Sequence, residues 1–398
     1  MPTTPITPPM QCLLALCSAG RIDPKPLATA LSETDWQTCW ALAERHRVIP
    51  IIAESLKHQP TIPVPDSFQA RLKQAIQQNV VQTLKNAAEL VRLTQQFDEH
   101  KIPFVTFKGI ALAHQMGLQF HQRHAGDIDL LLADQNDILR ADAFIMAAGY
   151  QRTNPSADIL SNRRQRQHFI RHVKDFTYQH PDTGVRLELH YRLLPNTAMC
   201  EYPPGSIYQR RSTCLIGQTA VPCMNQTDHQ LYLLLHGALS HWFRLKWLSD
   251  IPIISHQGQA YQQPEFWQQA QALGIERMMA LGLNLAHQLI KMPISTPVAQ
   301  YHDNQPVIQR LTQQARSALL RPKPMYTDLK SLNDKITWYF SYRTRHQLAL
   351  KQGLPYKIRW LGTYATDIDD WQTLPLPNAL FFLYYPLRPF IWLYQQLK

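Results

Sequence analysis

The sequence predicts an α+β protein in which a small α/β core with a mixed sheet, at about residues 100–195, is flanked by an N-terminal and a C-terminal helical region. Residues 66–99 repeat apolar side chains every three or four positions, which is the period of an amphipathic helix. Short β-rich runs then alternate with helical stretches from residue 101 to residue 192, and the helical period returns from residue 226. A segment of strands and helices between two helical segments is typical of this fold class.

The N-terminal helical region is assigned to residues 1–99. Asp35 stands where it can cap a helix that carries Trp36 and Trp40 among its apolar residues. Pro50 then begins a new segment, which is followed by the amphipathic helix already described.

The core, residues 100–195, is expected to contain strands, helices and a hairpin. Lys108-Gly109 follows the first strand, and Gly149 ends the second helix. Pro181, Asp182 and Gly184 separate the two strands of the hairpin. In chain order the expected elements are a strand at 102–107, a helix at 110–116, a strand at 127–132, a helix at 135–148, and hairpin strands at 173–179 and 185–191. The basic polar stretch at 151–172 is interpreted as an insertion.

The rest of the chain is interpreted as a linker at 196–225, a C-terminal helical domain at 226–350, and an irregular, aromatic tail at 351–398. Helices are expected at 228–249, 263–293, 303–320 and 329–350. The end of the tail, 378–398, is too short and too broken by proline to span a membrane. Three places stay open for this end: packing on the helical domain, a dimer contact, and a membrane interface, which suits aromatic residues.

Composition narrows the class of protein and its partners. Hydrophobic residues make up 45% of the 398 residues, which excludes a disordered chain. The formal net charge of +11 favours polyanionic partners, namely nucleotides, nucleic acid or an anionic membrane face. Six cysteines without a CxxC pair indicate free thiols in a reducing cytoplasm, and neither a secretory signal nor a spanning helix is expected. We therefore expect a cytoplasmic protein, with a peripheral place at the membrane left open by the tail.

Two carboxylates stand on the second predicted strand of the core. Side chains alternate between the faces of a strand, so Asp127 and Asp129 point the same way while Ile128 and Leu130 point into the core. Two carboxylates on one face repel each other and raise each other's pKa unless a cation lies between them. A divalent metal ion, which prefers oxygen ligands, can be the cation that lies between them.

A third carboxylate, Glu188, stands on a later predicted strand, on the same face as Arg186 and His190. Three carboxylates on adjacent strands can hold two Mg²⁺ ions about 3.5–4 Å apart, as in-line phosphoryl transfer requires. Glu188 can then also serve as the base. A DxD pair alone also caps turns or lies on a solvated strand face, so the order of the motifs carries the interpretation.

That order resembles the DNA polymerase β-like nucleotidyltransferase superfamily, in which a Gly-Ser turn, a DxD or DxE strand and a third acid on a later strand follow one another. More closely, the chain is similar to a bacterial family of uncharacterised nucleotidyltransferases often found near biosynthetic clusters. The segments that carry this resemblance are Phe107 to Ala113, Arg123 with Gly126 to Leu131, Leu187 to Arg192, and His236 to Ala238 with Arg244, Trp247 and Asp250, and more weakly His46 to Pro50, Asp370 to Pro377 and Leu387 to Pro389. The resemblance extends over most of the chain.

The turn departs from the wider superfamily, because Lys108-Gly109 stands where Gly-Ser is usual and Ile110 replaces the serine. The resemblance implies that Lys108 and Gly109 contact the triphosphate of a nucleotide. A glycine lets the backbone approach phosphate closely, and a lysine supplies charge that a serine hydroxyl does not.

Further residues near these motifs have two interpretations each. Arg123 either binds phosphate or pairs with a carboxylate, and His190 either binds nucleotide or is a hydrogen-bonded histidine beside the site. His236, Arg244 and Asp250 fall on one predicted helix, where spacings of eight and six residues do not align all three on one stripe. Helix packing and salt bridges are the favoured roles for these three residues.

The resemblance implies transfer of a nucleotidyl group from a nucleoside triphosphate, such as ATP, to an acceptor, with pyrophosphate leaving and with Mg²⁺ or Mn²⁺ as cofactor. Asp127 and Asp129 are then metal ligands, and Glu188 is the third ligand or the base. A nucleotide-binding or partner-binding module without turnover is an alternative, as is a metal-dependent phosphotransferase or phosphodiesterase. The acceptor stays open among a peptide, a small molecule, a sugar, a protein and an RNA.

Overall fold

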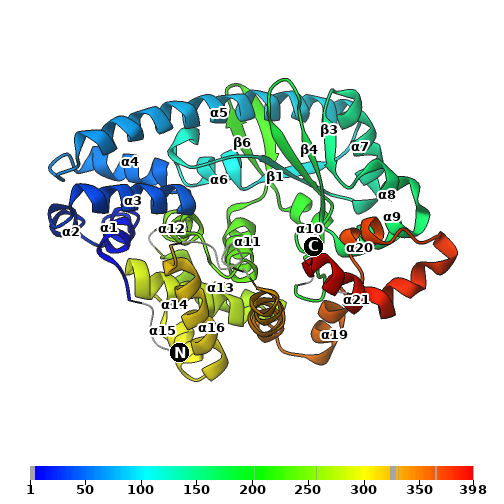
Figure 1. Ribbon diagram of the computed structural model, residues 1–398. Helices are drawn as coiled ribbons and strands as arrows, with labels where there is room; N and C mark the ends of the chain where they lie inside the picture. The colour runs from blue at the N-terminus through cyan, green and yellow to red at the C-terminus, as the bar shows by residue number, and fades with distance from the viewer. Residues whose placement is uncertain are drawn as a thin grey trace.

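A mixed sheet of seven strands runs through the protein (Figure 1). The computed structural model describes residues 5–397 apart from 201, 257, 323–328, 330 and 364. The strand order across the sheet is β3-β4-β5-β2-β1-β7-β6. The strands are β1 (Phe104–Phe107), β2 (Ile128–Leu132), β3 (Gln151–Asn154), β4 (Asp175–Gln179), β5 (Arg186–His190), β6 (Ser212–Ile216) and β7 (Thr219–Cys223). The predicted α+β fold with flanking helical regions is confirmed.

β2 lies at the centre of the sheet, antiparallel to β1 and parallel to β5. This parallel register sets Asp129 beside Glu188 and Leu130 beside Leu189. β4 and β5 form the antiparallel hairpin that the sequence predicts. Because side chains alternate along each strand, one face of β2 and β5 is apolar and the other carries the carboxylates.

The long helix α5 (Asp66–Glu99) runs along one face of the sheet (Figure 1) and has the bounds that its periodicity predicts. Together with α7 (Ile138–Ala147) it covers the apolar face. The rings of Phe97 and Phe144 meet edge to face with centroids 4.8 Å apart, above the fully buried Leu130. Each such buried side chain contributes roughly 1.5–3 kcal/mol to folding.

The opposite face of the sheet meets helices from both flanking regions. These are α1 (Pro8–Leu16), α3 (Glu33–His46), α11 (Gln226–Leu239), α14 (Glu276–Ile290) and α16 (Pro306–Leu320). Val105, Phe107 and Leu131 project from the sheet into the same buried cluster as these helices. Ser32, rather than Asp35, caps α3, and Asp35 completes a capping box at the third helical position.

The remaining helices are shorter or lie farther from the centre of the sheet. They are α2 (Lys25–Thr29), α4 (Ile49–His58), α6 (Gly109–Gln115), α8 (Ala157–Ser161), α9 (Arg163–His172), α10 (Pro204–Gln209), α12 (Leu245–Ile254), α13 (Pro264–Leu273), α15 (Thr296–Asp303), α17 (Leu332–Ile336), α18 (Arg345–Ala349), α19 (Leu354–Gly362), α20 (Ile368–Thr373) and α21 (Tyr384–Leu397). Short 3₁₀ turns are η1 (Phe120–Gln122), η2 (Gln135–Asp137), η3 (Ala260–Gln262) and η6 (Asn378–Leu383), and η5 (Thr337–Thr344) is a π-helix.

The interpretation of 196–225 as a linker was wrong, because this stretch contains α10 and the β6–β7 hairpin. β7 pairs in parallel with β1, where Cys223 lies beside Thr106. At the other edge of the sheet, β3 forms within the stretch interpreted as an insertion. Edge strands of four or five residues carry too few apolar positions to stand out from a loop, and they form because a neighbouring strand offers them hydrogen bonds.

The single helix predicted over 228–249 is two helices, because α11 ends at Leu239 and α12 begins at Leu245. Between them, His241 and Trp242 have φ angles of 53° and 52°, in the left-handed region that non-glycine residues rarely adopt. The Trp242 ring is fully buried and lies against Gly237 of α11 and Gly282 of α14. Burial of this ring therefore accompanies the sharp turn that separates the helices.

The prediction of an irregular tail over 351–398 was wrong, because α19, α20 and α21 form there. Tyr384 and Ile391 are buried in the cluster on the apolar face of the sheet. Phe390 and Leu397 of the same helix are 70% and 68% exposed. One side of α21 therefore packs on the protein, and a dimer or membrane contact through its other side stays a prediction. Within the described ranges, no helix is long and apolar enough to cross a membrane.

The packing of Trp242 predicts that Gly282→Ala destabilises the protein. A Cβ at Gly282 would lie 2.6 Å from the Trp242 ring and 2.8 Å from a methyl carbon of Leu234, so the core must shift. We expect a loss of about 1–3 kcal/mol in the free energy of unfolding, measured by urea denaturation. Gly362→Ala is the control, because a Cβ there meets nothing within 4 Å and alanine is the better helix former. Equal midpoints for the two variants would contradict the described packing.

Candidate functional site

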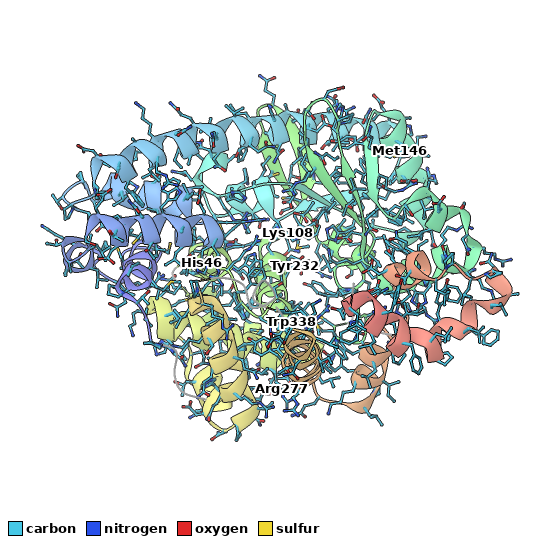
Figure 2. The ribbon with its side chains drawn as sticks, viewed as in Figure 1. His46, Lys108, Met146, Tyr232, Arg277 and Trp338 are labelled. Atoms are coloured by element: carbon cyan, nitrogen blue, oxygen red, sulfur yellow. The ribbon has the colours of Figure 1, made fainter. Side chains whose placement is uncertain are left out.

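A cavity of about 270 Å³ lies where β1, β2 and β5 face α11. Asp127, Asp129 and Glu188 all line it, together with Gly109 from the first turn of α6. Its lining also contains six basic side chains among the described residues, namely Arg47, Lys108, Arg123, Lys174, Arg244 and Lys246. Figure 2 shows Lys108, which follows β1, close to Tyr232 of α11 in the middle of the molecule. The structure thus brings all three predicted carboxylates into one strongly basic pocket.

Asp129 and Glu188 come together because of the parallel pairing of β2 with β5. The side chains next to them, Ile128 and Leu187, are buried on the opposite face, as alternation predicts. Asp127 lies just before β2 begins, so it enters the cavity from the end of the strand. Ligand atoms of Asp129, Glu188 and His190 lie within 4.8 Å of one another, the kind of group that can hold a metal ion.

His190 lies at the centre of the acidic group and is completely buried. Its Nε2 is 3.2 Å from Oδ1 of Asp129 and 3.2 Å from Oε2 of Glu188. Asp175, the first residue of β4, lies opposite His190 in the hairpin, with its Oδ2 3.6 Å from the same nitrogen. The interpretation of His190 as a hydrogen-bonded histidine beside the site therefore agrees with these contacts.

Asp129 is the most buried of the three predicted carboxylates, and Lys108 compensates its charge. The Lys108 ammonium lies 2.7 Å from Oδ1 of Asp129, whose side chain is 2% exposed. Burial alone would raise the pKa of Asp129, but Lys108 and His190 hold it well below its ordinary value. Burial would lower the pKa of Lys108, and the charge of Asp129 raises it instead. Both groups are therefore ionised at neutral pH.

Asp127 has the opposite shift. Burial raises its pKa, and the neighbouring charges of Asp129 and Glu188 raise it further. The repulsion that alternation predicts is therefore present at Asp127, whereas Lys108 removes it at Asp129. A cation bound near Asp127 would relieve this repulsion.

The turn after β1 has an unusual backbone at Lys108, with φ at 57° and ψ at −149°. Its backbone N–H donates to Nε2 of His229 over 2.9 Å. Burial lowers the pKa of His229 to about 3, so the ring is neutral and its Nδ1 donates to Oε1 of Gln115. Gly109 follows with φ at 36°, and a Cβ there would lie 3.5 Å from the carbonyl oxygen of Asp127. His229 thus fixes a strained turn that aims Lys108 at the carboxylates.

Arg123 pairs with a carboxylate, which is one of its two predicted roles. Its Nε and Nη2 donate to the two oxygens of Asp250 over 2.9 and 2.8 Å, and both side chains are almost fully buried. Nη1 of Arg123 has no hydrogen-bond partner in the part of the chain that the structure describes. The pair joins the loop before β2 to α12, because Asp250 belongs to that helix.

His236, Arg244 and Asp250 do not share one helix, so the prediction that placed them together was wrong. His236 is on α11, Arg244 is the N-cap residue of α12, and Asp250 is inside α12. His236 and Arg244 both line the cavity, and Asp250 holds Arg123. The turn between the helices brings Arg244 back to the pocket.

Sequence reasoning missed several polar residues of the site. Lys174 contacts Asp175 and lies 4.0 Å from Glu188, and Lys246 donates to the carbonyl oxygen of His124 over 2.6 Å. Burial, then the charge of Arg123, lowers the pKa of Lys246 well below its ordinary value. The hairpin alternation could have pointed to Asp175, which lies on the face of His190. Arg47 and Lys246 reach the pocket from separate helical regions, and no spacing in the sequence relates them.

The combination of basic side chains with a small group of carboxylates indicates which ligands the pocket suits. The cations favour an anionic ligand with several charges, such as a chain of phosphates. The carboxylate oxygens favour a hard divalent cation. A pocket with both features suits a metal-bound polyphosphate.

Comparison with known proteins agrees with this chemistry. The model of a protein family described as uncharacterised nucleotidyltransferase matches residues 32–291, which is more than half of the chain. The matched segment contains the three carboxylates, the Lys108-Gly109 turn and both α11 and α12. No curated protein matches the chain.

The buried ion pair predicts that Asp250→Ala costs about 3–5 kcal/mol of stability, because Arg123 would keep a buried charge without its partner. Asp182→Ala in the exposed turn between β4 and β5 is the matched control, and we expect its effect to stay within about 0.5 kcal/mol. Chemical denaturation followed by tryptophan fluorescence gives both values. Similar losses in the two variants would show that Arg123 and Asp250 are not paired in solution.

The backbone at Lys108 predicts an unusual order of stability between two variants. Lys108→Gly and Lys108→Ala both remove the ammonium group, but only glycine adopts this conformation without strain. We expect Lys108→Gly to be more stable than Lys108→Ala by about 1–3 kcal/mol in thermal or urea denaturation. Elsewhere in a folded chain glycine is usually the less stable choice, so the reverse order would rule out this turn geometry.

Proposed function

This chain belongs to the family of uncharacterised nucleotidyltransferases, and we propose that it transfers a nucleotidyl group from a nucleoside triphosphate to an acceptor with release of pyrophosphate. The observation that carries this proposal is the placement of Asp127, Asp129 and Glu188 in one cavity whose described lining also contains six basic side chains. The likeness of the motif order to polymerase β-like enzymes supports the same reaction.

The donor groups of the site fit a divalent cation. Asp129 and Glu188 offer carboxylate oxygens beside the His190 nitrogen, and Asp127 adds a carboxylate at the start of β2. Carboxylate oxygen donors suit Mg²⁺ and Mn²⁺. A bound ion of this kind would neutralise phosphate charge and lower the pKa of an attacking hydroxyl. Asp127, Asp129 and Glu188 are the proposed ligands.

The basic side chains are proposed to bind the triphosphate. The Lys108 ammonium lies between Asp129 and the ring of Tyr232, 5.5 Å from the centroid of that ring. Lys108 therefore borders the open part of the cavity. Gly109 leaves the backbone uncovered at the same edge. Arg123 borders the cavity while Asp250 fixes its orientation, and His190 orients the carboxylates. These four residues are the proposed nucleotide-binding set.

Glu188 is the proposed general base, because its side chain is 31% exposed whereas that of Asp129 is 2% exposed. In the proposed step the acceptor hydroxyl gives its proton to Glu188 and its oxygen forms a bond to the α-phosphorus. The bond from that phosphorus to the bridging oxygen breaks, and pyrophosphate leaves with the electron pair. Lys108 lies where it can offset the charge that develops on the leaving group.

A nucleotide-binding module without turnover is the second candidate, and one observation favours it. The chain's own Lys108 ammonium lies 2.7 Å from Asp129, so the protein neutralises its most buried ligand without a metal ion. Products separate this candidate from the first, and also from a phosphotransferase or phosphodiesterase. Only nucleotidyl transfer leaves nucleoside monophosphate on the acceptor and pyrophosphate in solution.

Replacement of the most buried ligand tests the proposed reaction. We expect Asp129→Ala to lower pyrophosphate release from a nucleoside triphosphate by roughly 100-fold or more, because charge stabilisation at the reacting phosphate is lost. Asp182→Ala, in the exposed turn between β4 and β5 and outside the cavity, should retain wild-type activity. Chelation with EDTA should abolish the activity, and added Mg²⁺ or Mn²⁺ should restore it. Unchanged turnover in Asp129→Ala would falsify the proposed site.

A further inference from the structure

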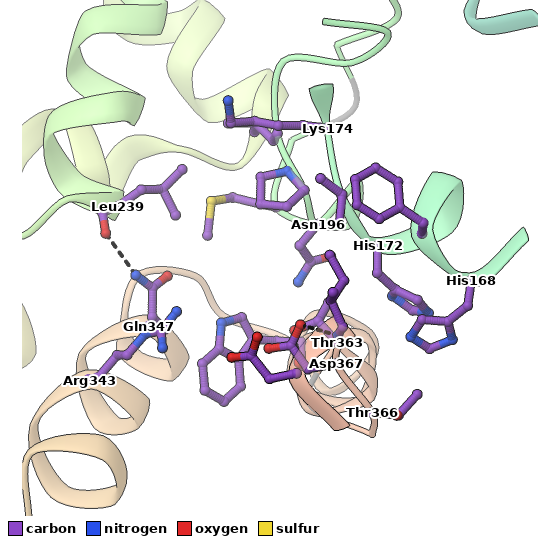
Figure 3. A pocket seen from close by; sticks show the side chains of 18 of the residues that line it. His168, His172, Lys174, Asn196, Leu239, Arg343, Gln347, Thr363, Thr366 and Asp367 are labelled. Carbon is purple, nitrogen blue, oxygen red and sulfur yellow. Dashed lines mark hydrogen bonds between the residues drawn. The ribbon is translucent and has the colours of Figure 1, made fainter. Parts of the chain in front are cut away.

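A second cavity, of about 600 Å³, adjoins the carboxylate cavity, and Figure 3 shows it from close by. The two cavities share Lys174, Tyr232 and His236 in their linings. The volume lies within the range of sites for small organic molecules. A molecule in the second cavity would therefore lie directly beside the proposed reaction centre.

Much of the wall of this cavity comes from a part of the chain that the family match does not cover. The match ends at residue 291, whereas Gln347, Trp360 and Trp392 all line the cavity. They belong to α18, α19 and α21, which pack beside α9 and the segment after β5. The carboxylate cavity is built within the matched segment, and the second cavity is closed by this chain's own C-terminal helices.

The chemistry of the second cavity differs from that of the first. Asn196, Gln347 and Gln395 line it with amide groups, and indole rings lie among them. Two of its charged side chains are compensated, since Arg388 pairs with Asp370 and Lys174 with Asp175. The lining is therefore mostly uncharged, aromatic and able both to donate and to accept hydrogen bonds.

Two polar atoms in this lining lack partners. Asn196 is only 7% exposed, its Oδ1 accepts from the backbone of Ala198, and its Nδ2 has no hydrogen-bond partner among the described residues. Figure 3 shows the Asn196 side chain directed into the pocket, on the side where Thr363 and Asp367 lie. Nε2 of His168 likewise has no partner in the described part of the chain. Buried polar atoms are seldom left unpaired, so these atoms point to a ligand with oxygen atoms.

We propose that the second cavity binds the acceptor of the transfer reaction, and that this acceptor is an uncharged, polyhydroxylated ring compound, a sugar or a cyclitol. This inference rests on the proposed function. Hydroxyl groups both donate and accept, which matches amide side chains and the unpaired donor of Asn196. The C–H face of a sugar ring packs on an indole ring such as that of Trp392. Glu188 lines the carboxylate cavity, which shares Tyr232 and His236 with the second cavity, so a ring held there would lie next to the cavity of the proposed base.

The charges at the edge of the cavity disfavour ionised acceptors of either sign. Asp367 and Asp369 line it and would repel an anion, and burial and Asp367 already raise the pKa of Asp369. Arg343 also lines it and would repel an ammonium group. An uncharged acceptor meets neither penalty.

Binding measurements with paired sugars test the class of acceptor. The probes are neutral hexoses, pentoses, their methyl glycosides and inositols, each hexose being paired with its 2-amino and its uronate analogue. Saturation-transfer NMR on the full-length protein identifies binders, and calorimetry gives their affinities. We expect at least one neutral probe to bind about tenfold more tightly than its amino and uronate analogues. Binding only of charged probes, or of none, overturns the proposal.

Substitutions in the lining test whether the sugar binds in this cavity. Trp392→Leu and Asn196→Asp should each weaken the neutral probe about tenfold, since the first removes a stacking surface and the second replaces the unpaired donor. Trp267→Leu is the control, because Trp267 packs on Tyr301 and lines neither cavity. Melting temperatures establish that all three variants fold. Equal affinity in Trp392→Leu and Trp267→Leu, or displacement of the probe by adenosine, overturns the assignment.

Binding of a fluorescent ATP analogue separates this inference from the proposed function. Trp392→Leu should leave ATP binding unchanged, whereas Lys108→Ala should weaken it and leave sugar binding unchanged. If ATP binds and no neutral sugar does, the acceptor inference fails alone. If a neutral sugar binds and ATP does not, the proposed nucleotidyl transfer fails while the sugar site stands.

Discussion

The parallel pairing of β2 with β5 sets the constraint on which the rest of the site depends. It lays Asp129 beside Glu188 on neighbouring strands, with the carboxylates on the face that α11 covers. Adjacent strands lie only about 4.8 Å apart, so two charged carboxylates in this position need compensation. His190 and Lys108 supply it at Asp129, and Lys174 supplies it near Glu188. The surrounding fold keeps those groups in place.

The need to compensate the charge of these carboxylates also explains several features elsewhere in the fold. Lys108 reaches Asp129 from a backbone conformation that costs energy, and the hydrogen bond from its N–H to His229 helps hold it there. His229 belongs to α11, so the helix that closes the cavity also fixes the turn. The Arg123–Asp250 pair ties the loop before β2 to α12 in the same way. Helices α11 and α12 are thus part of the site, although the carboxylates all come from the sheet and its edge.

Local patterns predicted the parts of this arrangement that local geometry decides. The bounds of α5 follow from its apolar period, and the shared face of Asp129 and Glu188 follows from alternation and strand pairing. Asp127 was predicted on the strand but precedes it, a one-residue shift that pattern reasoning does not resolve. Contacts between distant segments were not predictable. Arg47 and Lys246 meet in the pocket from different helical regions, and the break after α11 depends on Trp242 fitting against Gly282 of another helix.

The two adjoining cavities differ in the charge of their linings, so under the proposed function each would recognise a different substrate. The carboxylate cavity contains six basic side chains among the described residues and suits anionic groups, while the second cavity has a mostly uncharged lining. Strong positive potential attracts any polyanion, so it cannot by itself select one acceptor from many. Selection requires directed hydrogen bonds and shape, which the amide and indole side chains of the second cavity offer. Because α18, α19 and α21 close that cavity outside the matched segment, a change of the proposed acceptor would need no change in the residues proposed to hold metal and phosphate. Both cavities are lined by Lys174, Tyr232 and His236. Under the proposed function these residues would therefore lie between the bound acceptor and the reacting phosphate.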